Sequence, residues 1–247
     1  GLKDKLTVFS NMVVFSNYSV QVIMSFLLMS MVFVLWPRAD VSAQRIMEVL
    51  DTEPIVENGT KTAADVAKTG QRGTVEFRNV SFTYPDSREA MLEGINFTAE
   101  QGQTVAFIGS TGSGKSSLIN LVPRFYDTSQ GQVLVDGVDV RDYDLKALRD
   151  KIGYVPQQSF LFKGTIASNV AYGDTDRDDD TVRRACDVAQ ATEFIDKKQK
   201  KYDSGISQGD SNVSGGQKQR LSIARAVYRH PEILIFDDSF SALDFKT

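Results

Sequence analysis

Cysteine, histidine and surplus positive charge are all scarce in this 247-residue sequence. The single cysteine, Cys186, excludes an internal disulfide and fits a reducing compartment. Lys and Arg total 28 against 32 Asp and Glu, a formal net charge of −4, so charge gives no reason to expect DNA or RNA as a partner. The one histidine, His230, precedes Pro231 and an apolar stretch, and we interpret it as a surface residue at a helix end. No internal repeat is present.

Charged residues are also missing from a long N-terminal stretch, Thr7 to Pro37. As a helix this stretch would extend about 45 Å, more than the ~30 Å apolar core of a bilayer. A secretory signal peptide would have a shorter apolar core and a small-residue cleavage site, and neither is present. The sequence therefore predicts one membrane-spanning helix near its beginning.

The first half of this stretch carries polar side chains, whereas Phe26 to Trp36 is almost wholly apolar. Asn17 and Gln21 are four residues apart and share one helix face. In lipid such side chains face neighbouring helices or a water-filled cavity. Two interpretations stay open: hydrogen bonding between helices, or the lining of a pathway across the membrane. Because a single helix makes no pathway, we expect the sequence to begin partway through a larger membrane domain.

Two segments connect this helix to the rest of the chain. Ser42 to Leu50 has its apolar residues on one side and predicts a short amphipathic helix. Glu57 to Arg72 is polar, contains two glycines and has no apolar period, so it predicts a linker.

From Gly73 onward the pattern indicates an α/β domain. Apolar residues with strand-like spacing, broken at Arg78-Asn79, come first: Val75, Phe77, Val80 and Phe82. Further strands are predicted over Met91 to Ala99, Thr104 to Ile108, Gln132 to Val135 and Ile152 to Val155. Helices are predicted over Lys115 to Val122, around Thr181 to Thr192 and over Ser214 to Arg229. The last two predict a mainly α-helical insertion between two halves of the α/β core.

A glycine-rich loop, Gly109 to Ser116, lies between the predicted strand 104–108 and the predicted helix 115–122. Its glycines permit close backbone approach and positive φ, so that successive N–H groups can surround a phosphate. Lys115 adds a positive charge at the outer phosphates, and the Ser116 hydroxyl suits Mg²⁺. The succession of strand, loop and helix predicts a nucleotide phosphate site. Its candidate residues are Gly109, Ser110, Thr111, Gly112, Ser113, Gly114, Lys115, Ser116 and Ser117.

Two carboxylates follow the apolar run Ile233 to Phe236. Asp237 therefore lies at the C-terminal end of a buried strand, where α/β sheets bind their ligands. We expect Asp237 to hold Mg²⁺ directly or through water. Asp238 stands next to it.

A third motif, Val213-Ser214-Gly215-Gly216-Gln217, opens a predicted helix with Ser214 as its N-cap. Unpaired N–H groups and the positive end of the helix dipole suit a phosphate at such a position. With the glycine loop before it and the Asp237 strand after it, this motif resembles the signature of the ATP-binding-cassette (ABC) family. The resemblance is to the exporter type and covers about Asn11 to Asp244.

The resemblance implies an α/β fold, with a P-loop ATPase core, a helical subdomain and one long transmembrane helix in front. It implies that residues 1–50 are the C-terminal part of a membrane domain, with Pro37 to Asp51 resembling the exporter link. Residues 51–72 are then a linker, and residues 73–247 a nucleotide-binding domain.

Further residues match family positions. Tyr84, before Pro85, matches the aromatic residue that stacks on adenine. Gln157, after Pro156, matches the glutamine that senses Mg²⁺ and the attacking water and meets the membrane domain. In the family, the signature here represented by Ser214, Gly215, Gly216 and Gln217 points across a dimer interface at the γ-phosphate of the partner's ATP. Two segments match in position: Ser241 to Asp244 at the dimer interface, and Ser204 to Asp210 near the coupling helices.

Asp238 departs from the family pattern, because such exporters usually carry a glutamate there that positions or activates the attacking water. Aspartate draws the carboxylate back by about one carbon–carbon bond, and a misplacement near 1 Å can cost ~10²-fold in rate. We therefore expect ATP on this chain's own loop to be hydrolysed slowly or not at all. In ABC dimers each site takes its loop from one subunit and its signature from the other. An intact signature beside a weakened own site predicts the degenerate-site half of a heterodimeric exporter.

The resemblance implies an ATPase that uses ATP and Mg²⁺ and couples them to efflux of small amphiphilic or drug-like compounds. Its implied partners are a second half-transporter, the lipid bilayer and the transported small molecule, with no nucleic acid. The implied location is the plasma membrane, in a multi-pass protein whose ATPase domain is cytoplasmic. Residues matched to catalysis are Asp238, Gln157 and Lys115, and residues matched to the metal are Ser116, Gln157 and Asp237.

Two other functions within the ABC family compete with the exporter. A soluble ABC ATPase acting on DNA or ribosomes conflicts with the uncharged span and the acidic balance. A regulatory nucleotide-binding subunit that never hydrolyses ATP stays open. Because family members continue beyond the position of Thr247 with further strands, one ending in a histidine that contacts the γ-phosphate, we expect a fragment with an incomplete sheet that is inactive alone.

Overall fold

The computed structural model describes residues 1–207 and 212–239. Contacts within the chain divide it into two units, Gly1–Pro54 and Ile55–Thr247, and each is described by itself. The first unit consists of the helix α1 (Leu2–Leu50) and the few residues that follow it.

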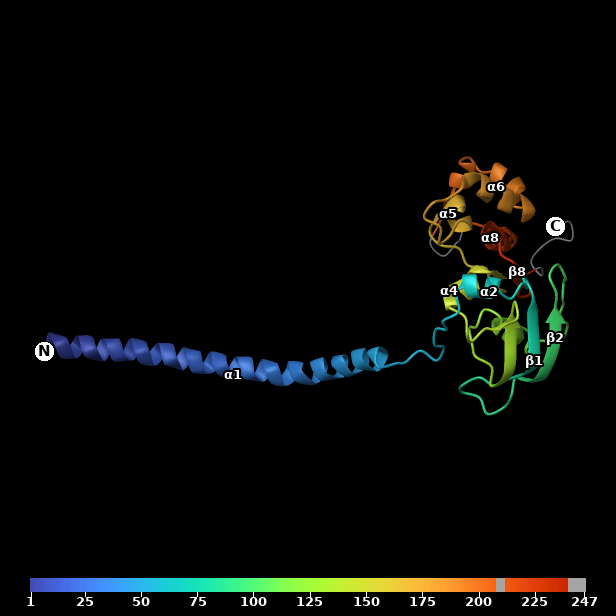
Figure 1. Cartoon of the computed structure of the whole chain (residues 1–247). Helices are drawn as coiled ribbons and strands as arrows, with labels where there is room; N and C mark the ends of the chain where they lie inside the picture. The colour runs from blue at the N-terminus through green and yellow to red at the C-terminus, as the bar shows by residue number, and fades with distance from the viewer. Residues whose placement is uncertain (208–211, 240–247) are drawn as a thin grey trace. The chain divides into compact units, whose positions relative to one another are not determined.

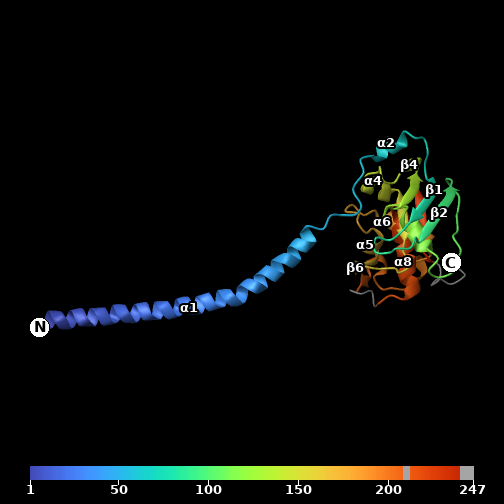
Figure 2. The same cartoon turned by 90° about the horizontal axis from the view of Figure 1, so that it is seen from below.

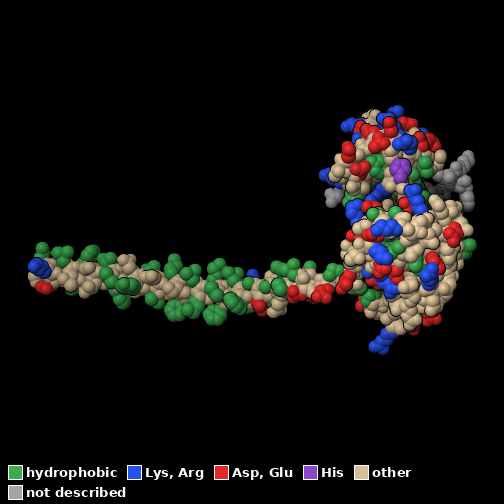
Figure 3. Space-filling model, in the orientation of Figure 1, with side chains coloured by type: hydrophobic (Ala, Val, Ile, Leu, Met, Phe, Trp, Pro, Cys, Tyr) green, Lys and Arg blue, Asp and Glu red, His purple; other side chains and the backbone are tan. Residues whose placement is uncertain are grey.

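Helix α1 is long and apolar enough to cross a membrane, with a mean hydropathy of 2.1 over 18 residues. None of its residues is buried within the unit, and hydrophobic side chains extend along it in Figure 3. The helix continues through Pro37 to Leu50, so the separate amphipathic helix expected over residues 42–50 is wrong. A proline inside a helix removes one backbone hydrogen bond and bends the helix, and α1 bends along its second half (Figure 2).

Polar groups of α1 fall into two kinds. Hydroxyls at five positions donate to the carbonyl four residues earlier: Thr7, Ser19, Ser25, Ser30 and Ser42. The side-chain amides of Asn17 and Gln21 make no hydrogen bond within the described residues. An unpaired amide is costly in hydrocarbon, so the face of Asn17 and Gln21 requires polar neighbours in a membrane.

The second unit begins with an antiparallel sheet in the order β2-β1-β3-β4. The predicted break in the first strand is confirmed: Asn79 has φ +49°, and the pairing shifts register on both sides of β1 there. Gly131 of β3 lies against this bulge, where a Cβ would come within 2.2 Å of the Asn79 carbonyl oxygen. The strands are β1 (Val75–Phe82), β2 (Leu92–Ala99), β3 (Gln130–Val135) and β4 (Val138–Asp139).

One hydrophobic core fills this sheet and its covering helices, and it includes all four apolar residues predicted for β1. The covering helices are α2 (Ala63–Ala67), α3 (Lys115–Asn120) and α4 (Leu145–Asp150). Helix α3 is shorter than the predicted 115–122 because residues 121–124 continue as turns. Those turns end at Arg124, which is buried and has φ +54°.

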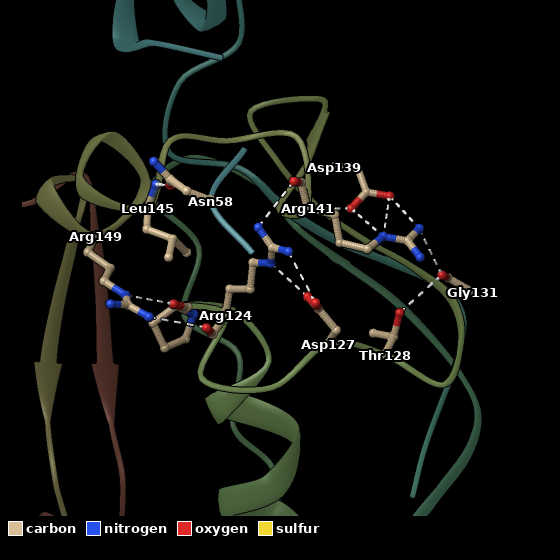
Figure 4. Close-up of polar contacts among 10 residues, drawn as sticks. Asn58, Arg124, Asp127, Thr128, Gly131, Asp139, Arg141, Leu145 and Arg149 are labelled. Carbon is tan, nitrogen blue, oxygen red and sulfur yellow. Dashed lines mark hydrogen bonds and ion pairs between the residues drawn. The ribbon is translucent and has the colours of Figure 1, made fainter. Parts of the chain in front are cut away.

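Arg124 fixes the chain after α3 (Figure 4). Its guanidinium donates to both Asp127 carboxylate oxygens and to the Arg141 carbonyl. Arg149 of α4 donates to the carbonyls of Pro123 and Arg124 on the other side. These bonds hold the C-terminal end of α3, and with it the loop at its N-terminal end.

A second hydrophobic core lies among helices α5 to α8, so the predicted α-helical insertion is confirmed. Figure 1 shows α5, α6 and α8 gathered apart from β1 and β2, with β8 between the two groups. Cys186 is fully buried in this core, as its position in an apolar helix face predicts. The elements are β6 (Gly164–Thr165), α5 (Ile166–Val170), α6 (Asp179–Val188), α7 (Thr192–Asp196), η1 (Lys201–Asp203), β7 (Gly205–Ile206) and α8 (Gly215–Tyr228).

A two-stranded parallel sheet joins the two cores, with β5 (Ile152–Val155) paired to β8 (Ile233–Phe236). Val155 belongs to the helical core, whereas Ile152 and Ile235 belong to the other. The strand expected over Thr104 to Ile108 is wrong, because those residues form no strand. Val105, Phe107 and Ile108 are exposed, Ile108 to 97%. A strand forms only where a neighbour pairs with its backbone, and no described strand pairs with this segment.

The segment predicted as a linker is fastened to the second unit over its C-terminal part. Gly59 donates to the Tyr143 carbonyl at 3.0 Å, and Lys61 donates to the Asp142 carbonyl at 2.8 Å. Asn58 accepts from the Leu145 N–H at 2.7 Å, which caps α4 (Figure 4). We call residues 58–61 with residues 142–145 the clamp. Beyond it, Val66 of α2 is 1% exposed and lies in the core.

Candidate nucleotide site

The glycine loop leads into α3 with a backbone that only glycine adopts easily. Gly112 has φ +82° and Gly114 has φ +88°, both in the left-handed region. A Cβ on Gly114 would lie 2.9 Å from a Leu92 methyl group and 3.2 Å from the Met91 carbonyl oxygen. Gly114 therefore has no room for a side chain, and Ser110, Thr111 and Ser113 stay exposed along the loop.

Lys115 is held by the loop it follows. Its ammonium group donates to the carbonyls of Gly109 and Ser110, both at 2.8 Å. These bonds keep the positive charge beside the loop, where a phosphate that takes up the backbone N–H groups would also meet it.

Ser116 and Asp237 are brought together from opposite ends of the domain. The Ser116 hydroxyl donates to an Asp237 carboxylate oxygen at 2.8 Å. One hydroxyl and one carboxylate are the protein ligands that Mg²⁺ takes when nucleotide phosphates complete its shell. The donor set present here therefore fits Mg²⁺ bound together with a nucleotide.

A tyrosine that the sequence reasoning missed, Tyr154 of β5, lies beside Asp237 and contacts Asn120 of α3. The Tyr154 hydroxyl lies 2.8 Å from the Asn120 side-chain oxygen and 3.4 Å from the second Asp237 oxygen. Burial, with the negative charge of Asp237, raises the pKa of Tyr154 to about 12. The phenol therefore stays protonated at neutral pH, and the nearer acceptor for its one hydrogen is the Asn120 side-chain oxygen. Its only sequence signal is a tyrosine inside a short apolar strand.

Asp238 and Gln157 face each other across the end of the parallel sheet. The Gln157 side-chain nitrogen lies 3.4 Å from an Asp238 carboxylate oxygen. Asp238 has φ +45°, a left-handed conformation that aspartate tolerates better than most residues. Ser239, which is buried, donates from its hydroxyl to the Val155 carbonyl at 2.9 Å and fixes the turn. The two residues matched to the attacking water thus lie together.

Tyr84 is held against the start of α3. Its hydroxyl and that of Ser117 are 2.9 Å apart. Its ring packs edge to face on Phe82 and Tyr126, with centroids 4.7 Å and 5.2 Å away. Tyr84, the residue matched to the adenine base, is therefore bonded directly to the helix that follows the phosphate loop.

The signature residues open α8 as predicted. Ser214 is the N-cap: its hydroxyl accepts from the Gln217 N–H, and the Gln217 side-chain oxygen accepts from the Ser214 N–H at 3.2 Å. Ser214 and Gly215 are exposed. Over the described ranges, no hydrogen bond or ion pair joins residues 214–217 to residues 109–117. The loop, residues 109–117, and the signature, residues 214–217, are thus separate groups in the described structure.

Two matched segments are described only in part or not at all. Ser241 to Asp244 lies outside the described residues. Of Ser204 to Asp210, the part up to residue 207 is described, and Gly205–Ile206 forms β7, paired with β6.

Comparisons with known proteins agree with this geometry. The family model described as ABC transporter matches residues 92–241. An ABC transporter ATP-binding protein of Mycobacterium bovis is 43% identical over 242 residues, which cover 96% of this chain and 40% of that protein. An ATP-dependent lipid A-core flippase of Aromatoleum aromaticum is 44% identical over 211 residues, covering 85% of this chain and 34% of that protein.

Among solved structures, a bacterial Atm1-family ABC exporter with ATP bound superposes with a TM-score of 0.75 at 32% identity. The match covers 85% of this chain and 36% of that exporter. The chain therefore spans about 40% or less of the length of these relatives.

Proposed function

The chain belongs to the ABC transporter family, and on that premise we propose that it is the ATP-binding part of one half of a membrane exporter. It carries the ABC ATPase fold, preceded by a long apolar helix as in the exporter structure it resembles. The full protein would couple ATP binding and hydrolysis to movement of a small molecule across the plasma membrane, with its ATPase domain in the cytoplasm.

The ATP of this chain would lie on the glycine loop. Gly109 to Ser117 would surround the phosphates, and Tyr84 would meet the base. Ser116 and Asp237, already 2.8 Å apart, would hold Mg²⁺ with Gln157 nearby. Bound there, Mg²⁺ neutralises charge on the outer phosphates. Tyr154 would lie beside this metal site, with its hydroxyl 3.4 Å from the Asp237 oxygen that does not contact Ser116.

The observation that carries the proposal is the separation of the two half-sites. The signature half-site, Ser214 to Gln217, is capped, is exposed at Ser214 and Gly215, and has no hydrogen bond or ion pair to the loop half-site, residues 109–117, within the described residues. A phosphate needs donors from several directions, and each half-site supplies one side. A second ABC chain would supply its signature to this chain's loop half-site and its loop to this chain's signature half-site.

Asp238 supports a heterodimer rather than a homodimer. Its short side chain holds a carboxylate 3.4 Å from Gln157, which leaves little length for reaching a water beyond them. The own site would then hydrolyse ATP weakly, while Ser214 to Gln217 serve a competent site on the partner. A regulatory subunit, by contrast, would never hydrolyse the ATP bound on its own glycine loop.

An aromatic patch supports contact with a membrane domain. Phe160, Phe162 and Tyr172 are exposed to 58%, 38% and 50%, although the Phe162 and Tyr172 rings stack with centroids 4.2 Å apart. The patch follows Gln157 in the chain, at the position where the family meets its membrane domain. We propose that this patch receives a loop of the membrane domain.

An amphiphilic transported compound is the substrate class that we favour. The first half of the span requires polar neighbours, at Asn17 and Gln21, while Phe26 to Trp36 is almost wholly apolar. A relative at 44% identity is a flippase whose name specifies a lipid A-core substrate, an amphiphile.

The test is transport by the full-length protein and its partner, reconstituted in lipid vesicles with a fluorescent amphiphile. We expect ATP-dependent movement of the probe that Lys115→Ala abolishes, because the loop loses its charge at the phosphates. Lys146→Ala, an exposed lysine of α4, should leave the rate unchanged. Probe movement that persists in Lys115→Ala, or ATP turnover by a detergent-free cytosolic protein, would contradict the proposal.

A further inference from the structure

The segment that follows Gln157 is fastened to the signature helix α8. The Ser159 hydroxyl donates to the side-chain oxygen of Gln219, in the second turn of α8, at 2.5 Å. The two residues are 60 positions apart, and Ser159 is two residues beyond Gln157.

A second anchor joins the same segment to α8. Arg225 donates to the Phe160 carbonyl at 2.9 Å and to the Asn169 carbonyl at 2.8 Å. Asn169, which is 1% exposed, donates to the Phe162 carbonyl and accepts from the Phe162 N–H. Burial lowers the pKa of Arg225, and its charge is met by carbonyls and by the Phe162 and Tyr172 rings.

On the N-terminal side of Gln157, the chain belongs to the parallel sheet of β5 and β8. Val155 pairs with Phe236, and its carbonyl accepts from both the Asp237 N–H and the Ser239 hydroxyl. Residues 156–158 are therefore a three-residue bridge between the sheet that carries Asp237 and the helix that carries the signature.

Gln219 is an unusual residue for a purely structural contact. It is 4% exposed, and its side-chain nitrogen has no hydrogen-bond partner in the part of the chain that the structure describes. If the amide is turned over, its oxygen is left unpaired instead, because Ser159 is its one side-chain partner there. An apolar residue of the same length would fill this place without burying an unpaired polar group. What the amide adds is the bond to Ser159.

We propose that Ser159 and Gln219 are positioning residues that transmit movement of the signature helix to Gln157. Because the bridge is only three residues long, a displacement of α8 moves Gln157 relative to Asp237 and Asp238. The signature, which would contact the partner's ATP, is thereby linked to Gln157, which would contact the ATP bound on this chain's own loop. This inference rests on the proposed function, since it assumes that Ser214 to Gln217 meet a partner's ATP.

The test uses the full-length protein in complex with its partner, with Gln219→Met, Ser159→Ala and the double variant. Three quantities are measured: nucleotide affinity, the ATPase kcat and KM, and the melting temperature. We expect kcat to fall about tenfold in each single variant and no further in the double variant, because both break one link. ATP affinity should stay within about twofold, and the melting temperature of Gln219→Met should not fall.

Two controls separate positioning from simple structural damage. Tyr228→Phe removes two other hydrogen bonds of α8, the one to Asp174 and the one from the Asp178 N–H, and should leave kcat unchanged. Ser159→Thr retains the hydroxyl and should restore most of the rate lost in Ser159→Ala.

The inference is overturned if kcat is unchanged, if the losses add in the double variant, or if the melting temperature falls in step with kcat. In each of these cases the wild-type complex still binds and hydrolyses ATP, so the proposed function survives. A wild-type complex that binds no ATP would overturn both.

Discussion

At the scale of single residues, the proposal of weak hydrolysis at this chain's own loop rests on Asp238. Its left-handed backbone, φ +45°, suits aspartate, and its carboxylate already lies beside Gln157. A glutamate would extend the carboxylate by one bond toward the phosphate loop while fitting that backbone less well. A glutamate at position 238 would therefore favour hydrolysis but disfavour the observed backbone conformation.

Asp238→Glu should speed hydrolysis at this chain's own loop by about 10- to 100-fold. The measurement is single-turnover release of phosphate from ATP bound by the full-length complex. A slightly lower melting temperature should accompany the gain, because glutamate is less tolerated at positive φ. Asp86→Glu, in an exposed turn, is the matched control and should change neither quantity. An unchanged rate in Asp238→Glu would favour the purely regulatory subunit.

At the scale of elements, the clamp turns a polar connecting segment into part of the ATPase domain. Seven residues, 51–57, separate the end of α1 from the clamp at Asn58. Gly59 is the clamp position that is most sensitive to an added side chain, because its backbone lies against residues 142 and 143. A Cβ there would come within 2.3 Å of the Tyr143 carbonyl oxygen and 2.4 Å of the Asp142 carbonyl oxygen.

Gly59→Ala should lower the free energy of unfolding of the domain by about 1–3 kcal/mol, because the backbone must move and lose its bonds to residues 142 and 143. Chemical denaturation of the full chain measures this. Gly205→Ala is the matched control, since its Cβ would meet one atom at an ordinary 3.9 Å, and it should change stability by less than about 0.5 kcal/mol. Equal midpoints for the two variants would show that the clamp is not stabilising.

Sequence patterns predicted local elements better than contacts between distant ones. The interrupted apolar spacing of residues 75–82 indicated both β1 and its bulge, and Ser214 indicated the start of α8. The apolar residues 104–108 also read as a strand, but strand formation depends on a partner's backbone, which apolar spacing does not encode. The clamp was missed for a similar reason: Asn58 caps a helix 87 residues away, so its local context reads only as a polar linker.

In the candidate site, too, the sequence predicted residues that belong to local motifs and missed residues that act through distant contacts. Motifs supplied Lys115, Ser116 and Asp237, and their order along the chain indicated that they converge. Tyr154 carries no motif, and Gln219 belongs to the run Gln217 to Arg220 that extends the signature but does not indicate its partner. Their contacts are with residues 83 and 60 positions away. Such supporting residues emerge only from the fold.

At the scale of the whole molecule, the two proposed half-sites are attached to two different hydrophobic cores. The loop half-site is attached to the core of β1 to β4, and the signature half-site to the core of α5 to α8. The β5–β8 sheet and the bridge at Gln157 connect them. The central claim is that ATP is held between this protein and a second ABC chain, each supplying one half-site.

The molar mass of the full-length protein, measured by light scattering while it is saturated with Mg²⁺ and ATP, tests this claim most directly. The account predicts particles that contain two ABC chains, either this protein with its partner or two copies of it. A protein that binds ATP normally and yet remains a single chain at saturation would contradict it.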